Sequence, residues 1–134
     1  MASLNRVTLI GNLGQEPVIR TTNDGATVAS FSVATTDRWH DKNTNEPKEA
    51  TEWHRVVCFR GLADIAKQIL HKGSKAYIEG KLTTRKWQDS EGRDIYTTEI
   101  IADKLIALDK NQNAQKEHYS GDEGYGDYNP PAGY

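Results

Sequence analysis

The residues of this 134-residue chain that are best suited to chemistry lie in TEWHRVVCF, residues 51–59. Residue character alternates here, so in an extended conformation Trp53, Arg55 and Phe59 point to one side of the backbone. A core-facing surface would not place a guanidinium between two aromatic rings, because burying an unpaired charge costs on the order of several kcal/mol. A surface made only for water would not carry two large aromatics. Single-stranded nucleic acid suits the combination, since bases stack on rings and phosphates meet cations.

The alternative is ordinary packing, because aromatics in strands are commonly half-buried and a neighbouring arginine commonly extends to solvent. The arrangement recurs, however. In KLTTRKW (81–87), Arg85 and Trp87 again share a side, and Trp39 stands at the mouth of a polar stretch over 40–50 that predicts a long exposed loop. A tryptophan at such a place has little core to pack into. The repetition favours binding over packing for the three tryptophans.

The elements that must position these residues follow from the periodicity of the sequence. Strands are predicted at 7–10 and 17–20, as one strand interrupted by the glycines of GNLG, then at 27–36 and 51–59, and on both sides of a turn at 90–92 within 74–108. In GLADIAKQILHKG (61–73), the helical spacing of Leu62, Ile65, Ala66 and Ile69 predicts the one helix with these side chains in the core, and Gly73 at its C-terminal cap. Five strands with a helix after the third match the OB-fold, an all-β barrel with one helix.

Glycines mark the expected bends of this barrel. GNLG (11–14) and Gly80 interrupt strand patterns, as glycines do at bulges and sharp bends, and Asp24-Gly25 predicts a hairpin turn. GNLG is not followed by Gly-Lys-Ser/Thr and does not lead from a strand into a helix, which argues against a phosphate-binding loop. The glycines therefore indicate structure rather than chemistry.

The charge balance divides the chain. Residues 1–110 contain 16 Lys and Arg against 15 Asp and Glu, net +1, and residues 111–134 contain 1 against 4, net −3, which together give the −2 of the whole chain. A cationic binding patch must therefore be local. Only 36% of the residues are hydrophobic, and beyond Asp109 the sequence has no periodicity, which predicts a domain over 1–109 and a disordered tail over 110–134.

The single cysteine, Cys58, excludes an intrachain disulfide, argues against a thiolate zinc site and fits a reducing compartment. No segment approaches the roughly 18 consecutive apolar residues of a membrane span. The N-terminal MASLNRVTLIGNLG lacks the charged and apolar regions of a secretory signal. We therefore expect a cytoplasmic protein without a membrane partner.

Carboxylates and histidines are the other groups that could do chemistry: Glu52, Glu79, Glu99, His40, His54, His71 and His118. No spacing among them gives a ligand cluster or a catalytic triad, and such scattered side chains are usually solvated or capping. The sequence therefore predicts no catalytic residues, no metal site, no cofactor and no enzyme. A module of the same fold that binds protein or RNA stays open, because stacking sites separate RNA from DNA poorly unless the 2′-hydroxyl is read.

Four motifs in order make the chain similar to a known family: NRVTLIGNLGQEPVIR (5–20), TEWHRVVCF (51–59), KGSKAYIEGKLTTRKW (72–87) and DIYTTEI (94–100). Over roughly residues 3–108 the chain resembles the bacterial single-stranded DNA-binding protein family. The resemblance implies OB-fold subunits that assemble as homotetramers. It also implies binding of single-stranded DNA without sequence preference, at the nucleoid, during DNA replication, recombination and repair.

The resemblance also assigns roles to single residues. The positions that match the family's stacking aromatics are Trp39, Trp53, Phe59 and Trp87. Those that match its phosphate-facing cations are Arg20, Lys42, Arg55, Lys72, Arg85 and Lys86. His54 matches a position at the subunit interface, which agrees with the alternation that sends it away from the Trp53 side.

The tail departs from the family pattern. Family members usually end in a long Gly-, Pro- and Gln-rich linker and an acidic tip with a final Pro-Phe pair, which recruits replication and repair proteins. Here the chain ends in NPPAGY (129–134), and its last acidic residues, Glu117, Asp122, Glu123 and Asp127, are scattered. Because residues 110–134 do not match this pattern, they give only weak support for replication and repair proteins as partners.

Overall fold

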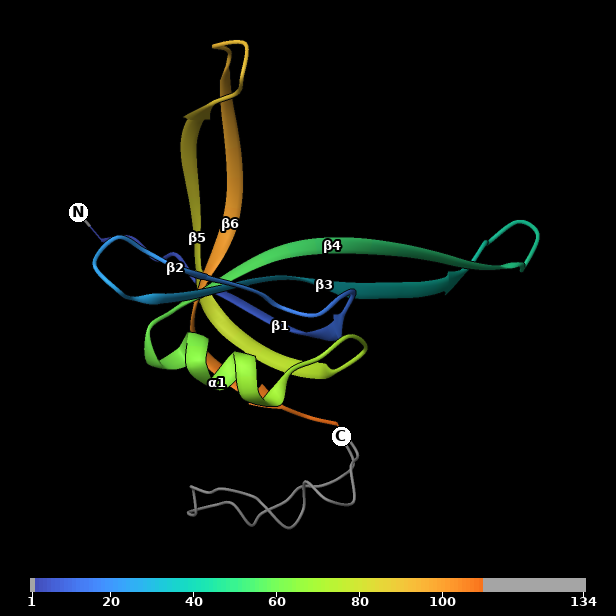
Figure 1. Ribbon diagram of the computed structural model, residues 1–134. Coiled ribbons are helices and arrows are strands. Elements are labelled where there is room, and N and C mark those ends of the chain that lie inside the picture. Colours follow the sequence, from blue (N-terminus) through green and yellow to red (C-terminus); the bar gives the residue numbers. More distant parts are fainter. Residues whose placement is uncertain (1, 110–134) are drawn as a thin grey trace.

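The structure, a computed structural model, describes residues 2–109 as six strands and one helix (Figure 1). In chain order these are β1 (Val7–Leu13), β2 (Val18–Thr21), β3 (Thr27–His40), β4 (Pro47–Phe59), α1 (Gly61–Ile69), β5 (Lys75–Gln88) and β6 (Asp94–Ala107). The predicted tail at 110–134 lies outside the described residues. The helix is too short to cross a membrane, and the described part of the chain contains no other.

The strands form one sheet that closes on itself. Their order is β1-β5-β6-β4-β3-β2, and an additional pairing of β1 with β3 closes the sheet into a barrel. β4 and β6 run parallel, whereas the other neighbours are antiparallel. Because β1 and β2 pair with successive parts of β3, they are two pieces of one interrupted strand. The predicted five-stranded OB-fold barrel is confirmed.

Two glycines allow the backbones of this barrel to approach one another. A Cβ at Gly11 would lie 2.2 Å from the carbonyl oxygen of Ala34, where β1 closes on β3. A Cβ at Gly80 would lie 2.2 Å from the carbonyl oxygen of Ile101, next to a register shift between Glu79 and Gly80. The bend predicted at Gly80 is confirmed. The first strand, expected to stop at residue 10, continues through Gly11 and is interrupted only after Leu13.

The interior of the barrel is small. Its fully buried side chains include Val33, Val56, Cys58 and Ile78, which come from β3, β4 and β5. α1 covers one end of the barrel, below the strands in Figure 1. Small side chains line the contact and let the helix come close.

The helix differs from the prediction in two respects. Its buried residues are Ala63 and Ala66, and Leu62 packs against the core, whereas Ile65 and Ile69, which the apolar spacing placed in the core, are exposed. The cap residue is Leu70, in an extended conformation, and Gly73 instead takes its positive φ of 88° in the turn that leads into β5. The contacts of α1 with β3, β4 and β6 therefore use the side of the helix that carries Ala63 and Ala66 rather than the two isoleucines.

Both long hairpins extend beyond the barrel. In Figure 1 the β3–β4 ribbon reaches to the right and the β5–β6 ribbon reaches upward. β3 and β4 stay in register from Val28 with Phe59 to His40 with Pro47. The loop predicted over residues 40–50 is therefore wrong, because strand pairing continues into it and only 41–46 turn. Asp41 organises this turn by accepting hydrogen bonds from the backbone N–H groups of Asn43 and Thr44.

We expect Gly80→Ala to destabilise the fold, because the added methyl would meet the Ile101 backbone, which cannot move without disturbing the β5–β6 pairing. Overpacking of this kind costs about 1–3 kcal/mol. Gly61→Ala is the matched control, since nothing lies within 4 Å of the added atom. Urea unfolding at a fixed protein concentration measures both variants. An equal free energy of unfolding for the two would contradict the close approach.

Burial raises the pKa of the Cys58 thiol from 9.0 to about 12. Because the folded state favours the neutral thiol, this contribution to stability is complete below about pH 9 and is lost as the pH rises toward 12. At pH 8 we expect 5,5′-dithiobis(2-nitrobenzoate) to label Cys58 at least ~100-fold more slowly in the native protein than in urea, since the reactive species is the thiolate. Prompt labelling of the native protein would show that the thiol is accessible.

Candidate nucleic-acid interface

The β4, β6 and β5 strands present one continuous outer face. Val56 of β4 and Ile100 of β6 are register partners, and both are buried in the barrel. Their neighbours Arg55 and Glu99 therefore point outward. Glu99 in turn shares its side with Thr83, its register partner on β5. By alternation, the outer face carries Trp53 and Arg55 from β4, Glu99 and Thr97 from β6, and Arg85 and Trp87 from β5.

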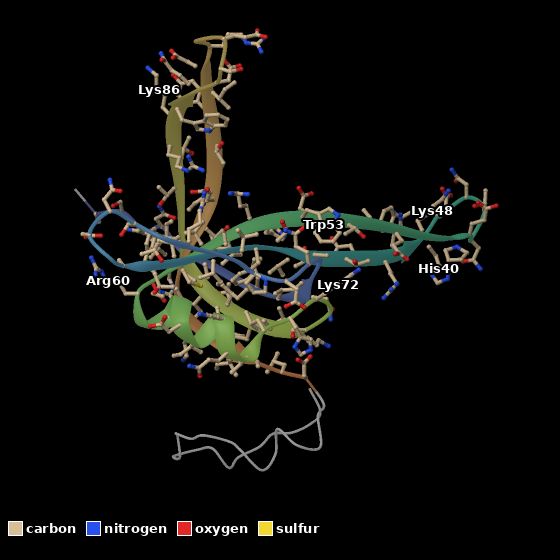
Figure 2. All side chains as sticks on the ribbon, in the orientation of Figure 1. His40, Lys48, Trp53, Arg60, Lys72 and Lys86 are labelled. Carbon is tan, nitrogen blue, oxygen red and sulfur yellow. The ribbon has the colours of Figure 1, made fainter. Side chains whose placement is uncertain are left out.

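Trp53 lies on the backbone of Gly14, in the segment between β1 and β2. A Cβ at Gly14 would be 2.6 Å from Cζ3 of the indole, so only glycine leaves room for the ring. The residue is nevertheless 58% exposed. Figure 2 shows Trp53 on the β3–β4 ribbon, well before the ribbon's far end, where His40 and Lys48 lie. The indole therefore packs against Gly14 and keeps a large exposed surface.

Trp87 is held by a hydrogen bond across the β5–β6 ribbon. Its Nε1 donates to Oγ1 of Thr97 at 2.9 Å, while 42% of the residue stays exposed. A fixed indole with an exposed surface is suited to stacking, because the ring loses little conformational freedom when a planar group covers it.

Between the two tryptophans lies a cluster of three charged residues, Glu99, Arg55 and Arg85. Arg55 Nε donates to Glu99 Oε2 at 2.9 Å, and Arg85 donates from Nε to Oε1 and from Nη2 to Oε2, both at 3.2 Å. Burial of Glu99 acts to raise its pKa, but the hydrogen bonds and charges of Arg85 and Arg55 outweigh this and hold the pKa below its ordinary value. Glu99 is therefore ionised at neutral pH, and the cluster carries a net charge of +1.

Sequence reasoning missed this role of Glu99. It placed Arg55 and Arg85 among the phosphate-facing cations without seeing that one carboxylate holds both. The only available signal was the alternation in DIYTTEI, which puts Glu99 on the same side as Thr97 and Ile101. The partners could not be found from it, since the pairing of β4 with β6 is parallel and joins residues far apart in sequence.

Phe59 and Trp39 complete the predicted aromatics, and both are exposed. Phe59 ends β4 on the same side of that strand as Trp53. Trp39 does not join them. It pairs with Lys48, and the unbroken register places it on the side of the β3–β4 ribbon opposite to Trp53. There it borders a hollow whose other lining residues are Arg38, His40, Pro47, Lys48 and Glu49.

The remaining predicted cations are exposed and lie apart. Arg20 is on β2, Lys42 is in the turn between β3 and β4, and Lys72 follows α1. Lys86 pairs with Asp94 at 3.5 Å, on the side of the β5–β6 ribbon opposite to Trp87. The structure thus brings two of the six cations to the face between the tryptophans and distributes the other four.

His54 lies on the other side of β4 from Trp53, and its Nε2 is 2.9 Å from Oγ1 of Thr35 on β3. This placement agrees with the prediction that His54 points away from the side of the strand that carries Trp53. A role at a subunit interface stays a prediction. Within residues 2–109, no group of His, Cys, Asp and Glu side chains could hold a metal ion.

The closed barrel, with aromatic and cationic side chains on its outer face, defines an OB-fold protein with a candidate nucleic-acid interface. Comparison with known proteins narrows this class to one family. Residues 4–108 match the single-strand binding protein family, and the chain belongs to that family. The match covers every strand and the helix described above.

Individual relatives agree with the family assignment. The chain is 53% identical over 116 residues to the single-stranded DNA-binding protein 1 of Xylella fastidiosa, which covers 87% of this chain and 85% of that protein. It is 49% identical over 128 residues to the single-stranded DNA-binding protein of Rickettsia prowazekii, covering 92% of this chain and 84% of the relative. The solved Plasmodium falciparum SSB complex with ssDNA matches with a TM-score of 0.74 and 43% identity, over 81% of this chain and 98% of that one.

We expect Gly14→Ala to displace the Trp53 ring, because the methyl would lie within contact of the indole, which can move more easily than the backbone. With 5-fluorotryptophan in the protein, ¹⁹F NMR should show three resonances, and Gly14→Ala should shift the one that is lost in Trp53→Phe. Gly61→Ala should shift none of them. An unmoved Trp53 resonance in Gly14→Ala would mean that the indole does not lie on Gly14.

Proposed function

We propose that this protein binds single-stranded DNA without sequence preference and protects it during DNA replication, recombination and repair. The observation that carries the proposal is the outer face of β4, β6 and β5, where two exposed tryptophans flank two arginines. Family membership and the structural likeness to an SSB bound to ssDNA support it. We assign the activity to residues 1–109.

Binding combines two contributions that are both tolerant of sequence. Bases stack on the exposed indoles of Trp53 and Trp87 and on Phe59, and each stack contributes about 1–3 kcal/mol, because every base has a planar face. Phosphates contact the arginines. Each neutralised phosphate makes the fall of log affinity with log salt concentration steeper by about 0.7 for a single strand. Since residues 1–110 have a net charge of only +1, stacking matters more than bulk attraction.

The positions of the predicted residues favour a curved path for the strand. Trp39 and Trp53 lie on opposite sides of the β3–β4 ribbon, and Lys86 and Trp87 lie on opposite sides of the β5–β6 ribbon. A straight strand could not meet all of these positions on one subunit. We propose that the DNA wraps around the ribbons, with Arg20, Lys42, Lys72 and Lys86 as additional phosphate contacts along its path.

We further propose that the protein acts in the cytoplasm as a homotetramer, with His54 at a subunit contact, as family members do. Multiple subunits would let one strand engage several stacking faces, which raises the overall affinity without new kinds of contact. We propose a binding function and no catalysis. Replication and repair proteins as partners would act through residues 110–134, outside the described part of the chain.

Tryptophan fluorescence during titration with oligo-dT, at low and high salt, tests the proposal. We expect strong quenching at sub-micromolar protein, and in Trp53→Ala a smaller amplitude with an affinity about 5- to 150-fold lower, the loss of one stack. Ile65→Ala is the control, because it truncates an exposed apolar side chain on α1.

Emission that stays flat with oligo-dT at both salt concentrations would overturn the proposal and favour a protein-binding module. If oligo-dT does quench the emission, competition between matched deoxy- and ribo-oligomers shows whether DNA or RNA is the preferred strand. Equal competition by the two would limit the proposal to single-stranded nucleic acid in general.

A further inference from the structure

Glu99 has an unusual place for an acidic residue. It is only 5% exposed, although it lies on the outer face that we propose to bind an anionic strand. Both of its carboxylate oxygens accept hydrogen bonds from the guanidinium groups of Arg55 and Arg85. The carboxylate therefore has little to offer a ligand directly, and its effect must pass through the arginines.

The arginines keep donors for a ligand while they bind Glu99. A guanidinium has five N–H groups. Arg55 uses one of them on Glu99, and Arg85 uses two. The two arginine side chains are 44% and 48% exposed, and among the described residues Glu99 is the one side chain to which both donate hydrogen bonds.

Two effects of Glu99 on anion binding oppose one another. Its negative charge lowers the positive potential of the face, which weakens attraction to phosphates. Its hydrogen bonds fix two long side chains that would otherwise lose rotamer freedom on binding, and its charge offsets the repulsion between their guanidinium groups. The geometry favours the second effect, because one carboxylate bridges the two arginines with three hydrogen bonds and so fixes the positions of both guanidinium groups.

We propose that Glu99 is a positioning residue for single-stranded DNA binding, which holds Arg55 and Arg85 side by side between the two tryptophans so that their free N–H groups meet backbone phosphates. The inference rests on the proposed function and adds to it a residue whose charge has the wrong sign for a phosphate contact. Glu99 acts only through the arginines and does not touch the strand.

Glu99→Gln separates positioning from charge. The amide keeps the size of the side chain but removes its negative charge, so charge alone predicts tighter binding of oligo-dT and a steeper salt dependence. Positioning predicts the reverse, because the amide has one acceptor oxygen where the carboxylate has two, its NH₂ group faces donors, and its hydrogen bonds lack the charge that strengthens those of Glu99. We expect binding about three- to tenfold weaker than wild type. We also expect a log-log salt slope shallower by about 0.7–1.4, the loss of one or two phosphate contacts.

Asp24→Asn is the charge-matched control. Asp24 also pairs with an arginine, Arg60, at 3.6 Å, but in an exposed turn between β2 and β3. Asp24→Asn removes one negative charge, as Glu99→Gln does, and it should not weaken the binding of oligo-dT. Glu99→Asp is the second variant, and it decides the question if Glu99→Gln does not fold. It keeps the charge but shortens the side chain, so positioning predicts weaker binding with a shallower slope, whereas charge alone predicts no change.

Wild-type protein is titrated in parallel, and urea unfolding establishes that each variant is folded. Tighter or equal binding by Glu99→Gln, or weaker binding with an unchanged salt slope, overturns the inference and leaves the proposed function intact. If wild type itself does not bind oligo-dT, the proposed function fails, and the inference fails with it. Weaker binding with a shallower slope in Glu99→Gln, or in Glu99→Asp if Glu99→Gln does not fold, supports the assignment, provided that Asp24→Asn shows neither change.

Discussion

Closure of the barrel depends on one short pairing, that of Asn12 and Leu13 on β1 with Ala34 and Val33 on β3. Only a residue without a side chain at position 11 lets these two backbones approach closely enough. Closure encloses the interior and leaves no free edge along this part of the sheet. It also decides which half of each alternating strand is buried, and therefore which residues are left outside. Part of the functional face is thus a consequence of closure, because alternation leaves Arg55 and Glu99 on the outside of the barrel where their neighbours Val56 and Ile100 are buried inside it.

The small interior has a second consequence. Strands of 13 and 14 residues are longer than such a narrow barrel needs, so β3–β4 and β5–β6 continue outward as two-stranded ribbons. Side chains on both sides of a ribbon outside the barrel are available to solvent. This is why Trp39 and Trp53 can lie on opposite sides of one ribbon and still both be exposed. The ribbons provide binding area that the core could not.

Local pattern predicted most of the fold and part of the site. Alternation identified Trp53 with Arg55 and Arg85 with Trp87, since period-two spacing within one strand decides which side chains share a side. It could not reveal the Glu99 cluster, because that depends on which strands become neighbours. The side of Trp39 was missed for a different reason: turn-forming residues suggested a loop where cross-strand pairing extends the ribbon to His40. For α1, contact with the barrel end overrode the apolar spacing and left Ile65 outside.

The contact between Trp53 and Gly14 bears on the choice between single and double strands. Because Gly14 lies beside the six-membered ring of this indole, a base can approach only the part of the ring that Gly14 leaves exposed. A base inside a duplex already has neighbours above and below it, and it offers no free side to such a ring. A base in an unpaired strand can turn away from its neighbours at small cost. If the proposed function holds, the contact with Gly14 would therefore make the exposed part of Trp53 better suited to an unpaired base than to a base within a duplex.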